Sequence, residues 1–343
     1  MNVEIIDPRS FPGWDALIEG APQASIFHTA AWARVLSESY GYRPLYFTSM
    51  ERGRLVGLIP LMEIDSFLTG KRGVALPFTD LCEPVAPARP AFERLLEEVV
   101  SYGKKAGWKG VEFRGGERFL PDQPPTAGHL VHTLALDPDE TRVEKGFKPN
   151  TRRNIRRAGD EGITVALERS GAAMAAYYRL HCGTRRHHGL PPQSWSFFSR
   201  IHEHVVAPGH GFVALAHYQG RAVAGAVFFN FRDQAIYKFG ASNRDHLSLR
   251  PNNLVMWEAI RWCCRSGIRT FNFGRTEPGN EGLLQFKRGW GAVEQKLNYY
   301  RYDLKAGAFT AGAAGPRTSY AVFKLMPAPL LRLAGALMYR HVG

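Results

Sequence analysis

Residues 272–291, NFGRTEPGNEGLLQFKRGWG, combine the residue types best suited to chemistry in this chain. The glycines let a backbone and a ligand approach each other closely, and loops that follow strands carry many of the reactive groups of α/β proteins. A lysine flanked by Phe286 and Trp290 would keep its charge while partly desolvated, so it would stabilise a developing oxyanion more strongly than in open water. We therefore expect Lys287 to be a catalytic cation.

Other charged residues of the same stretch suit an acceptor amine. Glu277 and Glu281, together with Arg275, would orient such an acceptor or relay its proton. Asn280 and Phe286 are expected to line its binding site. The alternative interpretation is an ordinary glycine-rich surface loop.

A second candidate site is a basic segment that contains no carboxylate. The cations in residues 145–157 are Lys145, Lys148, Arg152, Arg153, Arg156 and Arg157. Asn150 or Thr151 is a natural N-cap, which predicts a helix that begins at Arg152. Arginines four apart would repel one another at the positive end of the helix dipole. We expect Lys148 and the four arginines to bind phosphate, with free backbone amides at the helix start. A solvated basic helix is the alternative.

Metal and nucleophile chemistry find little support in the sequence. The cysteines have no zinc or disulfide spacing, so buried reduced thiols are expected at Cys82, Cys182, Cys263 and Cys264. No histidine pair follows a His-Glu-x-x-His pattern, which indicates surface or packing roles for His181, His187, His188, His202, His204 and His210. No Gly-x-Ser-x-Gly elbow occurs.

Two internal repeats indicate a duplicated α/β unit. Residues 107–117 resemble residues 267–277, and each copy reads as a strand entered through a glycine after a predicted helix. Residues 53–57 and 220–225 form a second pair, each at a turn before an apolar strand. Both pairs are separated by roughly half the chain, so one unit occurs twice instead of many short repeats.

Predicted elements follow the same order in both halves. The first half reads helix 30–39, strand, turn 51–54, strand, helix 89–106 and strand 111–114. The second half reads helix 171–184, strands 211–218, 222–231 and 234–241, helix 253–266 and strand 270–273. We assign a first domain to residues 1–140, a basic connecting helix to 141–161, a second domain to 162–305, and a flexible connector with a tail to 306–343.

Composition limits the classes of partner. The chain has 343 residues, 45% of them hydrophobic, and a formal net charge of +13, so two cores and a polyanionic or phosphate-bearing partner are expected. The N-terminus lacks a secretory signal and no stretch is apolar enough to cross a bilayer, which indicates a cytoplasmic protein. A helix in the tail would place Leu330, Leu333, Ala334, Leu337 and Met338 on one face, with Arg332 and Arg340 available to anionic headgroups. A helix docked on the protein's own surface is the alternative to peripheral contact with the inner membrane.

Several motifs in order resemble the Fem family of peptidoglycan-bridge aminoacyltransferases, in particular its proteobacterial branch associated with PEP-CTERM exopolysaccharide loci. The similar segments are residues 27–32, 76–80, 148–158, 237–242, 249–257, 271–277 and 282–291. The resemblance implies an α/β (α+β) fold of two tandem acetyltransferase-like (GNAT) domains, each with a central mixed sheet flanked by helices. It also implies an aminoacyl-tRNA donor and a diphosphate-bearing acceptor. The chain lacks the long helical hairpin that some members use for tRNA contact.

The resemblance also suggests roles for particular residues. The Phe-Lys pair of the family's last motif matches Phe286 and Lys287, which implies that Lys287 stabilises the transition state. Tyr237, Lys238 and Asp80 lie in further matching motifs and are expected to bind substrate.

Taken together, the sequence predicts acyl or aminoacyl transfer to an amine of a cell-wall or exopolysaccharide-related precursor, through a tetrahedral intermediate and without a cofactor. An acyl-CoA-dependent GNAT N-acyltransferase is one alternative. It would need a glycine-rich pyrophosphate loop, and residues 243–253 contain no glycine. A non-catalytic scaffold that binds polyanions, such as RNA or polysaccharide, is the second alternative.

Overall fold

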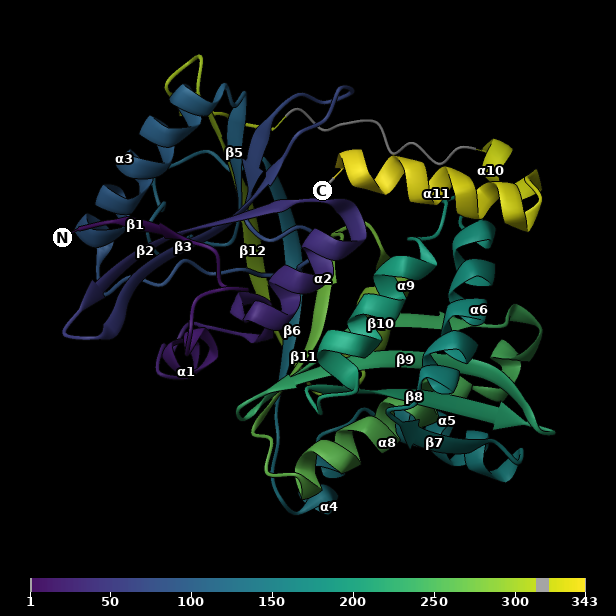
Figure 1. Ribbon diagram of the computed structural model, residues 1–343. Helices are drawn as coiled ribbons and strands as arrows, with labels where there is room; N and C mark the ends of the chain where they lie inside the picture. The colour runs from purple at the N-terminus through teal and green to yellow at the C-terminus, as the bar shows by residue number, and fades with distance from the viewer. Residues whose placement is uncertain (1, 313–320, 343) are drawn as a thin grey trace. The chain divides into compact units, whose positions relative to one another are not determined.

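The computed structural model describes residues 2–312 and 321–342, which fall into two compact units (Figure 1). Unit 1 comprises Met1–His129, Lys296–Arg317 and Leu337–Gly343, and unit 2 comprises Leu130–Gln295 and Thr318–Ala336. The first boundary falls eleven residues before the one expected at residue 140, and both units draw on more than one stretch of the chain.

Unit 1 is built around a sheet with strand order β1–β2–β3–β4–β5–β12. Its strands are β1 (Glu4–Ile6), β2 (Arg43–Glu51), β3 (Arg54–Ile64), β4 (Arg72–Val74), β5 (Gly110–Arg114) and β12 (Val293–Asp303), with β13 (Ala308–Phe309) paired to β12. Its helices are α1 (Trp14–Glu19), the 3₁₀ turn η1 (Ile26–His28), α2 (Ala30–Tyr40) and α3 (Arg89–Ala106). Strands β4 and β5 are parallel and the other neighbours are antiparallel.

Unit 2 has a sheet with strand order β7–β8–β9–β10–β11–β6. The strands are β6 (Ala127–Ala135), β7 (Thr164–Glu168), β8 (Gly211–Tyr218), β9 (Arg221–Phe231), β10 (Gln234–Ser242) and β11 (Thr270–Thr276). The helices are α4 (Glu140–Lys145), α5 (Pro149–Asp160), α6 (Gly171–His187), α7 (Trp195–Ile201), the π-helical turn η2 (His202–Val206), the 3₁₀ helix η3 (Arg244–Leu249), α8 (Pro251–Arg265), α9 (Glu281–Arg288) and α10 (Ala321–Leu325). The last helix, α11 (Ala328–Val342), has residues in both units.

The two sheets have the same plan, which confirms the duplication. In unit 2, β10 and β11 are the parallel pair and the other neighbours are antiparallel, as in unit 1. Helix α3 joins β4 to β5, and α8 joins β10 to β11. The last strand of each sheet comes from the opposite half of the chain, because β6 follows β5 but pairs with β11, whereas β12 follows α9 but pairs with β5. This exchange explains why the expected domain boundaries differ from the units.

The repeated glycines occupy equivalent backbone positions. The β2–β3 turn has positive φ at Arg52 (50°) and Gly53 (74°), and the β8–β9 turn has it at Gln219 (49°) and Gly220 (74°). Two residues of positive φ are typical of the type I′ turn that suits the twist of a hairpin. The strands start directly at these turns, a few residues earlier than the apolar runs alone indicate.

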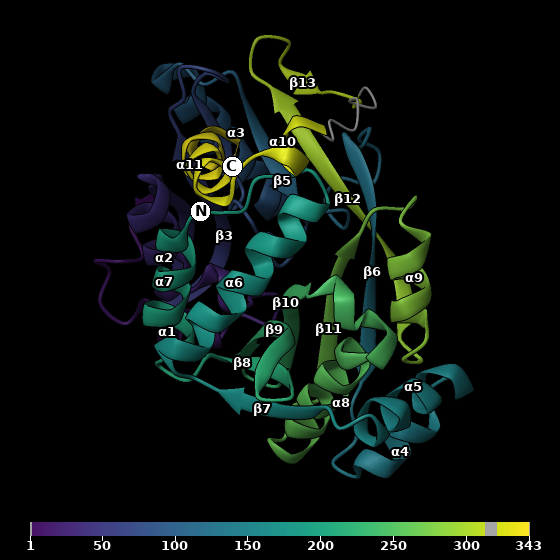
Figure 2. The same cartoon turned by 90° about the vertical axis from the view of Figure 1, so that its right-hand side faces the viewer.

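Alternating side chains of the unit 2 strands pack on opposite faces of its sheet. Phe212 and Phe228 lie in the core that includes α8, and Trp262 of that helix packs 4.5 Å from Phe212 between ring centroids. Gly225 on the opposite face leaves room for Tyr177 of α6. Helices α6 and α8 therefore cover opposite faces of the sheet (Figure 2).

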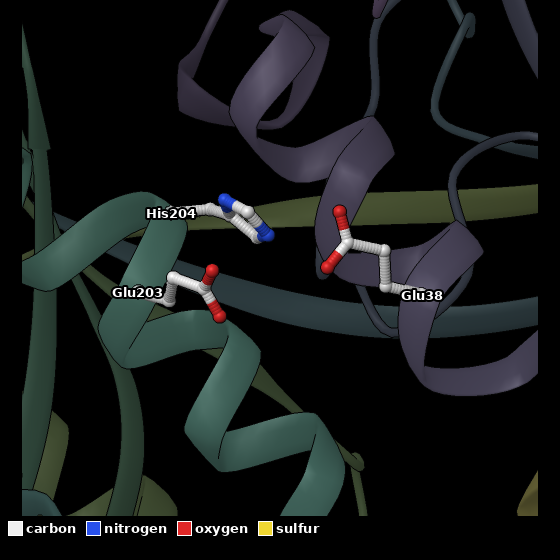
Figure 3. Close-up of side chains that lie close together, drawn as sticks. All are labelled: Glu38, Glu203 and His204. Carbon is white, nitrogen blue, oxygen red and sulfur yellow. The ribbon is translucent and has the colours of Figure 1, made fainter.

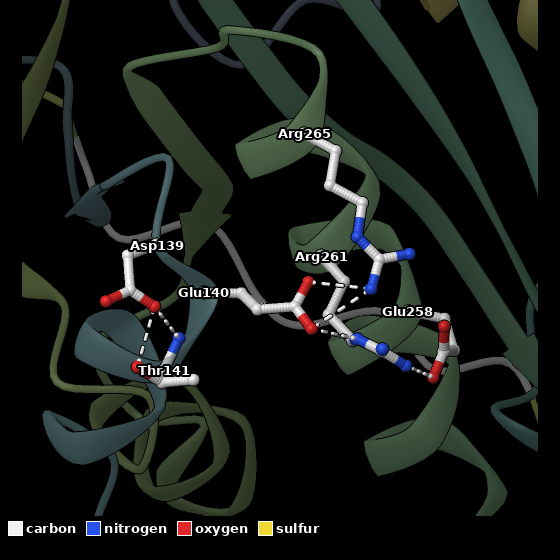
Figure 4. Close-up of polar contacts among 6 residues, drawn as sticks. All are labelled: Asp139, Glu140, Thr141, Glu258, Arg261 and Arg265. Atoms are coloured by element: carbon white, nitrogen blue, oxygen red, sulfur yellow. Dashed lines mark hydrogen bonds and ion pairs between the residues drawn. The ribbon is translucent and has the colours of Figure 1, made fainter.

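Helix α4 is held to α8 by a network of ion pairs (Figure 4). Asp139 caps α4 by accepting from the Thr141 N–H at 3.0 Å. Glu140 accepts from Arg261 Nε at 3.1 Å and from Arg265 at 3.0 Å, and Arg261 also pairs with Glu258 at 2.9 Å. Burial raises the pKa of Glu140, but the hydrogen bonds from Arg265 and Arg261 lower it more, so the carboxylate stays ionised.

The C-terminal region differs from the expected flexible connector, and its last helix packs on the protein. Residues 308–309 form β13 instead of a flexible connector, and residues 313–315 of that expected connector lie outside the described residues. Helix α11 buries Leu331, whereas Leu330, Leu333 and Leu337 are each more than half exposed. The predicted apolar face therefore points to solvent. The other side of the helix docks on the protein, because Gly335 lies against the Pro192 backbone and the His341 ring lies 3.0 Å from the Ser66 hydroxyl, which confirms the docked helix. None of the described helices has the length and hydropathy needed to cross a bilayer.

Candidate active site

The end of β11 is distorted where the loop to α9 begins. Its register with β6 shifts between Asn272 and Arg275, and Gly274 adopts a φ of 70°. A bulge with glycine in the left-handed region bends a strand and redirects the chain. After a short turn, the Asn280 side chain accepts from the Leu283 N–H and caps α9.

Helix α9 buries Leu284 and Lys287 and leaves most of its other residues accessible to solvent. The Lys287 side chain is 1% exposed, so it is fully desolvated and not merely partly so, as the sequence suggested. Its ammonium donates to the carbonyl oxygen of Gly274 at 2.7 Å and to that of Arg275 at 3.2 Å. A buried ammonium needs such partners because its desolvation is costly. The bulge therefore presents the carbonyls that hold the cation.

A histidine lies at the same point on the neighbouring strand. In the register of β6 with β11, Thr133 pairs with Asn272 and Val131 with Arg275, which puts His132 opposite the bulge. His132 is fully buried, and its Nε2 lies 2.9 Å from Glu294. Glu294 is held in turn by Arg288 of α9 at 2.8 and 3.0 Å. His132, Glu294 and Arg288 form one polar network, and the charge of Lys287 acts on His132.

The network sets the protonation of its members. Burial lowers the pKa of His132, its hydrogen bond to Glu294 opposes that shift, and the nearby charge of Lys287 lowers the pKa further. The hydrogen bond from Arg288 is the main reason that the pKa of Glu294 lies below its ordinary value. At neutral pH we therefore expect a neutral imidazole beside a carboxylate.

Several buried polar atoms of this region have no hydrogen-bond partner among the described residues. They are Nδ1 of His132, Oγ1 of Thr276 and Nε1 of Trp290. Native proteins leave few such atoms unsatisfied, and those that remain often mark a functional position or an ordered water. Thr276 is the last residue of β11 and Trp290 follows α9. Both therefore lie beside Lys287 along the chain or at the strand that holds it.

The other residues expected at this site occupy its exposed rim. Glu277, Glu281, Arg275 and Asn280 are exposed, and the Asn280 side-chain oxygen is already used as the helix cap. Phe286 is half-buried and packs edge-on against Trp290 at 5.8 Å. Glu277 thus lies on the loop that joins β11 to α9, and Glu281 is the first residue of α9.

Residues taken from the resembling motifs are more dispersed. Tyr237 on β10 packs against Phe228, and burial raises its pKa to about 12, so its phenol is a neutral packing group. Lys238 places its ammonium 5.1 Å from the Phe239 ring. Asp80 belongs to unit 1, where its backbone oxygen accepts from the Tyr299 hydroxyl at 2.6 Å.

The basic segment forms one wall of a groove between α4 and α5. The groove encloses about 1030 Å³ and is lined by Thr141, Glu144, Lys145, Pro149, Arg152, Arg153, Arg156, Arg157, Asp160 and Glu161. Arg152 donates to the Lys145 carbonyl, Arg153 to Asn150, and Arg157 pairs with Glu161 at 3.5 Å. Arg156 has no hydrogen-bond or ion-pair partner among the described residues. The groove brings the four predicted arginines together.

The helix start predicted for this segment is wrong. Helix α5 begins at Pro149, with Lys148 as its N-cap, and Thr151 is buried within its first turn. Proline suits the first helical position because its φ is fixed and it lacks an N–H. The Lys148 N–H donates to Gly289, and the Thr151 N–H donates to Lys148. An anion would therefore bind guanidinium groups here and gain little from backbone amides.

The remaining histidines and the cysteines agree with packing roles. All four cysteines are free and buried. His181 lies among Tyr178, Phe198 and Phe239 and bonds to Gln193 at 2.9 Å. Glu203 and His204 lie on η2 of unit 2, whereas Glu38 lies on α2 of unit 1 (Figure 3). These three residues belong to different units and define no metal site within either described unit.

Comparisons with known proteins show what the second unit is similar to. Residues 145–288 match the family model described as acetyltransferase (GNAT) domain. These residues are similar to that domain. The match runs from the end of α4 to the end of α9 and includes Lys287, whereas His132 and Glu294 lie outside it.

Relatives and solved structures agree with the expected Fem-type resemblance and tandem fold. The chain is 28% identical to a lipid II:glycine glycyltransferase of Staphylococcus haemolyticus over 95 residues, 26% of this chain and 23% of the relative. It thus spans about a quarter of the length of the curated relatives that it matches. The structure of FemX has a TM-score of 0.70 at 14% identity and covers 89% of this chain and 98% of its own. A tandem GNAT protein from the clavulanic acid biosynthesis pathway has a TM-score of 0.54 at 11% identity and covers 88% and 99%.

Proposed function

We propose that this chain transfers an aminoacyl group to an amine of a cell-wall or exopolysaccharide-related precursor. The observation that carries the proposal is the buried Lys287 ammonium, held by two carbonyls at the distorted end of a strand in a GNAT-like domain. The similarity to proteins named as lipid II glycyltransferases supports the choice of acceptor. The PEP-CTERM association belongs to the same proposal.

In the proposed reaction, the neutral acceptor amine attacks the carbonyl carbon of an aminoacyl ester. A C–N bond forms, and the carbonyl oxygen becomes an oxyanion in a tetrahedral intermediate. Lys287 supplies a fixed positive potential in a region from which water is excluded, where a charge acts more strongly than in solvent. Collapse of the intermediate breaks the ester C–O bond, and the amine proton passes to the departing oxygen. Glu277 and Glu281 on the exposed rim would relay that proton, and Arg275 would orient the acceptor.

Aminoacyl-tRNA is the donor that we propose, with the α4–α5 groove as a binding site for its phosphates. The five cations of this groove, including the unpaired Arg156, outnumber its three carboxylates. Such contacts would weaken as the salt concentration rises. No cofactor is needed for this reaction.

The backbone after β10 disfavours the acyl-CoA alternative. Ordinary GNAT enzymes need a glycine-rich turn here, whose amides bind a pyrophosphate at a helix start. In this chain the 3₁₀ helix η3 leads to Arg250, with a φ of 59°, and α8 then starts with Pro251. Proline has no N–H to offer an anion. A non-catalytic polyanion scaffold remains the second alternative.

A transfer assay with two donors tests the proposal. Purified protein would be incubated with a lipid-linked peptidoglycan precursor and either a pool of aminoacyl-tRNAs or acetyl-CoA, and the precursor would be analysed by mass spectrometry. We expect a mass increase of one aminoacyl residue with the tRNA pool. Modification by acetyl-CoA alone would favour the rival enzyme. Binding of both ligands without any product would favour the scaffold.

Peripheral contact with the inner membrane, from the cytoplasmic side, completes the proposal. The chain has no Asp or Glu after Asp303, whereas Lys324, Arg332 and Arg340 flank the exposed leucines of α10 and α11. Of the exposed large apolar residues, those in this segment are Val322, Leu325, Leu330, Leu333, Leu337, Met338 and Val342. An apolar helix face bordered only by cations suits an anionic bilayer surface.

A further inference from the structure

A cavity of unit 2 outside the candidate active site has an unusual charge balance. It encloses about 860 Å³ and lies between α6, the start of β9 and the segment that joins β10 to η3. Its lining residues are Ala176, Arg179, Leu180, Gly183, Thr184, His187, His188, Gly220, Arg221, Ala222, Ser242, Asn243, Arg244 and Leu247. Three are arginines, two are histidines and none is acidic. The α4–α5 groove, in contrast, includes three carboxylates among its lining residues.

The backbone that carries the three arginines is well fixed. Thr184 of α6 donates its hydroxyl to the Ser242 carbonyl at 3.2 Å and accepts from the Ser242 N–H at 3.1 Å. The Asn243 side chain caps η3 and so fixes the position of Arg244. Arg221 follows the type I′ turn at Gly220 directly. The guanidinium groups therefore project from three elements of defined geometry.

The charges of the cavity are not neutralised within the protein. Arg179 and Arg221 have no hydrogen-bond or ion-pair partner among the described residues. Arg244 lies 3.2 Å from Nδ1 of His187, a contact that leaves its other donors available. Burial lowers the pKa of His188, and His187, Arg185, Arg244 and Lys324 lower it further, which indicates a positive local potential. An anion in the cavity would relieve this repulsion.

We propose that this cavity binds a small ligand that carries a diphosphate group, with Arg179, Arg221 and Arg244 as its principal contacts. Guanidinium groups bind phosphate oxygens in pairs through two parallel N–H donors, and three arginines match the charge of a diphosphate. The cavity volume is typical of small-molecule sites, which favours a nucleotide-sized ligand over an extended nucleic acid. The site stands independently of the acyl transfer proposed above, because none of its residues belongs to the Lys287 network.

Calorimetric titration of the full chain at low salt tests this site, with inorganic pyrophosphate and UDP as probes. We expect both to bind, and we expect Arg221→Gln and Arg179→Gln each to weaken binding at least fivefold. All three arginines are exposed, so these variants should fold normally. Arg269→Gln, at an exposed arginine outside the cavity, is the matched control and should bind like the wild type. Tighter binding of UDP than of pyrophosphate would indicate a nucleotide ligand, and equal binding would indicate that the diphosphate alone is recognised.

Two outcomes would overturn the proposal. One is unchanged affinity for both probes in Arg179→Gln and Arg221→Gln variants that keep the wild-type melting temperature. The other is loss of affinity only on Arg153→Gln and Arg156→Gln, which would place the bound diphosphate in the α4–α5 groove. Neither outcome would bear on acyl transfer, which the two-donor assay measures separately.

Discussion

Lys287 owes its position to a local distortion more than to its neighbours in sequence. Phe286 and Trp290 flank it along the chain, but the Gly274 and Arg275 carbonyls hold its ammonium. The sequence identified the lysine because a cation after a glycine-rich strand end is conspicuous. It did not reveal His132, which lies 155 residues earlier and meets Lys287 only through the pairing of β6 with β11. β6 carries two buried imidazoles, His129 and His132, and this pair of histidines is the signal that sequence reasoning overlooked.

We predict that His132 positions the Lys287 network during transfer. His132→Gln should lower kcat at least tenfold and leave KM for the acceptor nearly unchanged. Because the pKa of His132 lies below its ordinary value, the imidazole is neutral at pH 7, and protonation at lower pH would place a second cation beside Lys287. The wild-type rate should therefore fall at pH values below the ordinary histidine pKa of about 6.5, and the variant should lose this dependence. His129→Gln, on the same strand, is the control. Identical kcat and pH profiles for His132→Gln and the wild type would argue against this role.

His181 provides a stability prediction at the same scale. Burial lowers its pKa to about 3, Arg185 lowers it further, and the hydrogen bond to Gln193 only partly opposes the shift. The folded state thus favours the neutral form, so the stabilisation is complete above the unfolded-state pKa of about 6.5 and is lost as the pH falls towards about 3. The slope for one such group reaches about 1.4 kcal/mol per pH unit. Urea unfolding of His181→Gln between pH 7 and pH 4 should show a flatter dependence than the wild type. If the unfolding free energies of the variant and the wild type changed in parallel with pH, another titratable group would dominate the pH dependence of stability.

At the scale of elements, two glycines with positive φ differ in what opposes a side chain. At Gly291 both the backbone conformation and a close neighbour oppose it, whereas at Gly267 only the backbone conformation does. Gly291 follows α9 with a φ of 70°, and a Cβ there would lie 2.6 Å from the backbone oxygen of Gly146. Gly267 has a φ of 75°, but open space surrounds it. Gly291→Ala should therefore cost at least about 2 kcal/mol of unfolding free energy, from strain plus a backbone clash, whereas Gly267→Ala should cost about 1 kcal/mol. Thermal or chemical unfolding of both variants measures the difference. Equal losses of unfolding free energy in the two variants would mean that the backbone near Gly146 shifts easily to make room for the methyl group.

Element boundaries were predictable wherever local signals were strong. Helix 89–106 and strand 211–218 agree with α3 and β8 residue for residue, and the repeated glycines predicted the matching hairpins. The start of α5 was missed because Asn150 and Thr151 are good caps, while the bond from the Lys148 N–H to Gly289 is a tertiary contact. Strands β6 and β12 were missed for the same kind of reason. Their pairing with the sheet of the opposite half leaves no trace in the local sequence.

At the scale of the whole molecule, the tail and the net charge point to an anionic surface. We predict that the protein cosediments with vesicles containing phosphatidylglycerol and much less with vesicles of phosphatidylcholine. Replacement of Leu330, Leu333 and Leu337 with serine should reduce binding at least tenfold, because these side chains are already exposed and their change removes apolar area without unfolding the chain. Val293→Ser, at an exposed apolar residue of β12, is the control. Equal sedimentation of the triple variant would exclude α11 as the contact.

The central claim is that the buried Lys287 cation promotes amide formation. The most direct measurement is the single-turnover rate of aminoacyl transfer by Lys287→Met, with Lys296→Met as an exposed-lysine control and with melting temperatures for both. Because a fixed charge in a dry site acts mainly on the transition state, we expect the rate to fall by about 10²–10³ in Lys287→Met. The control should retain the wild-type rate. A folded Lys287→Met protein that transfers at the wild-type rate would contradict the account.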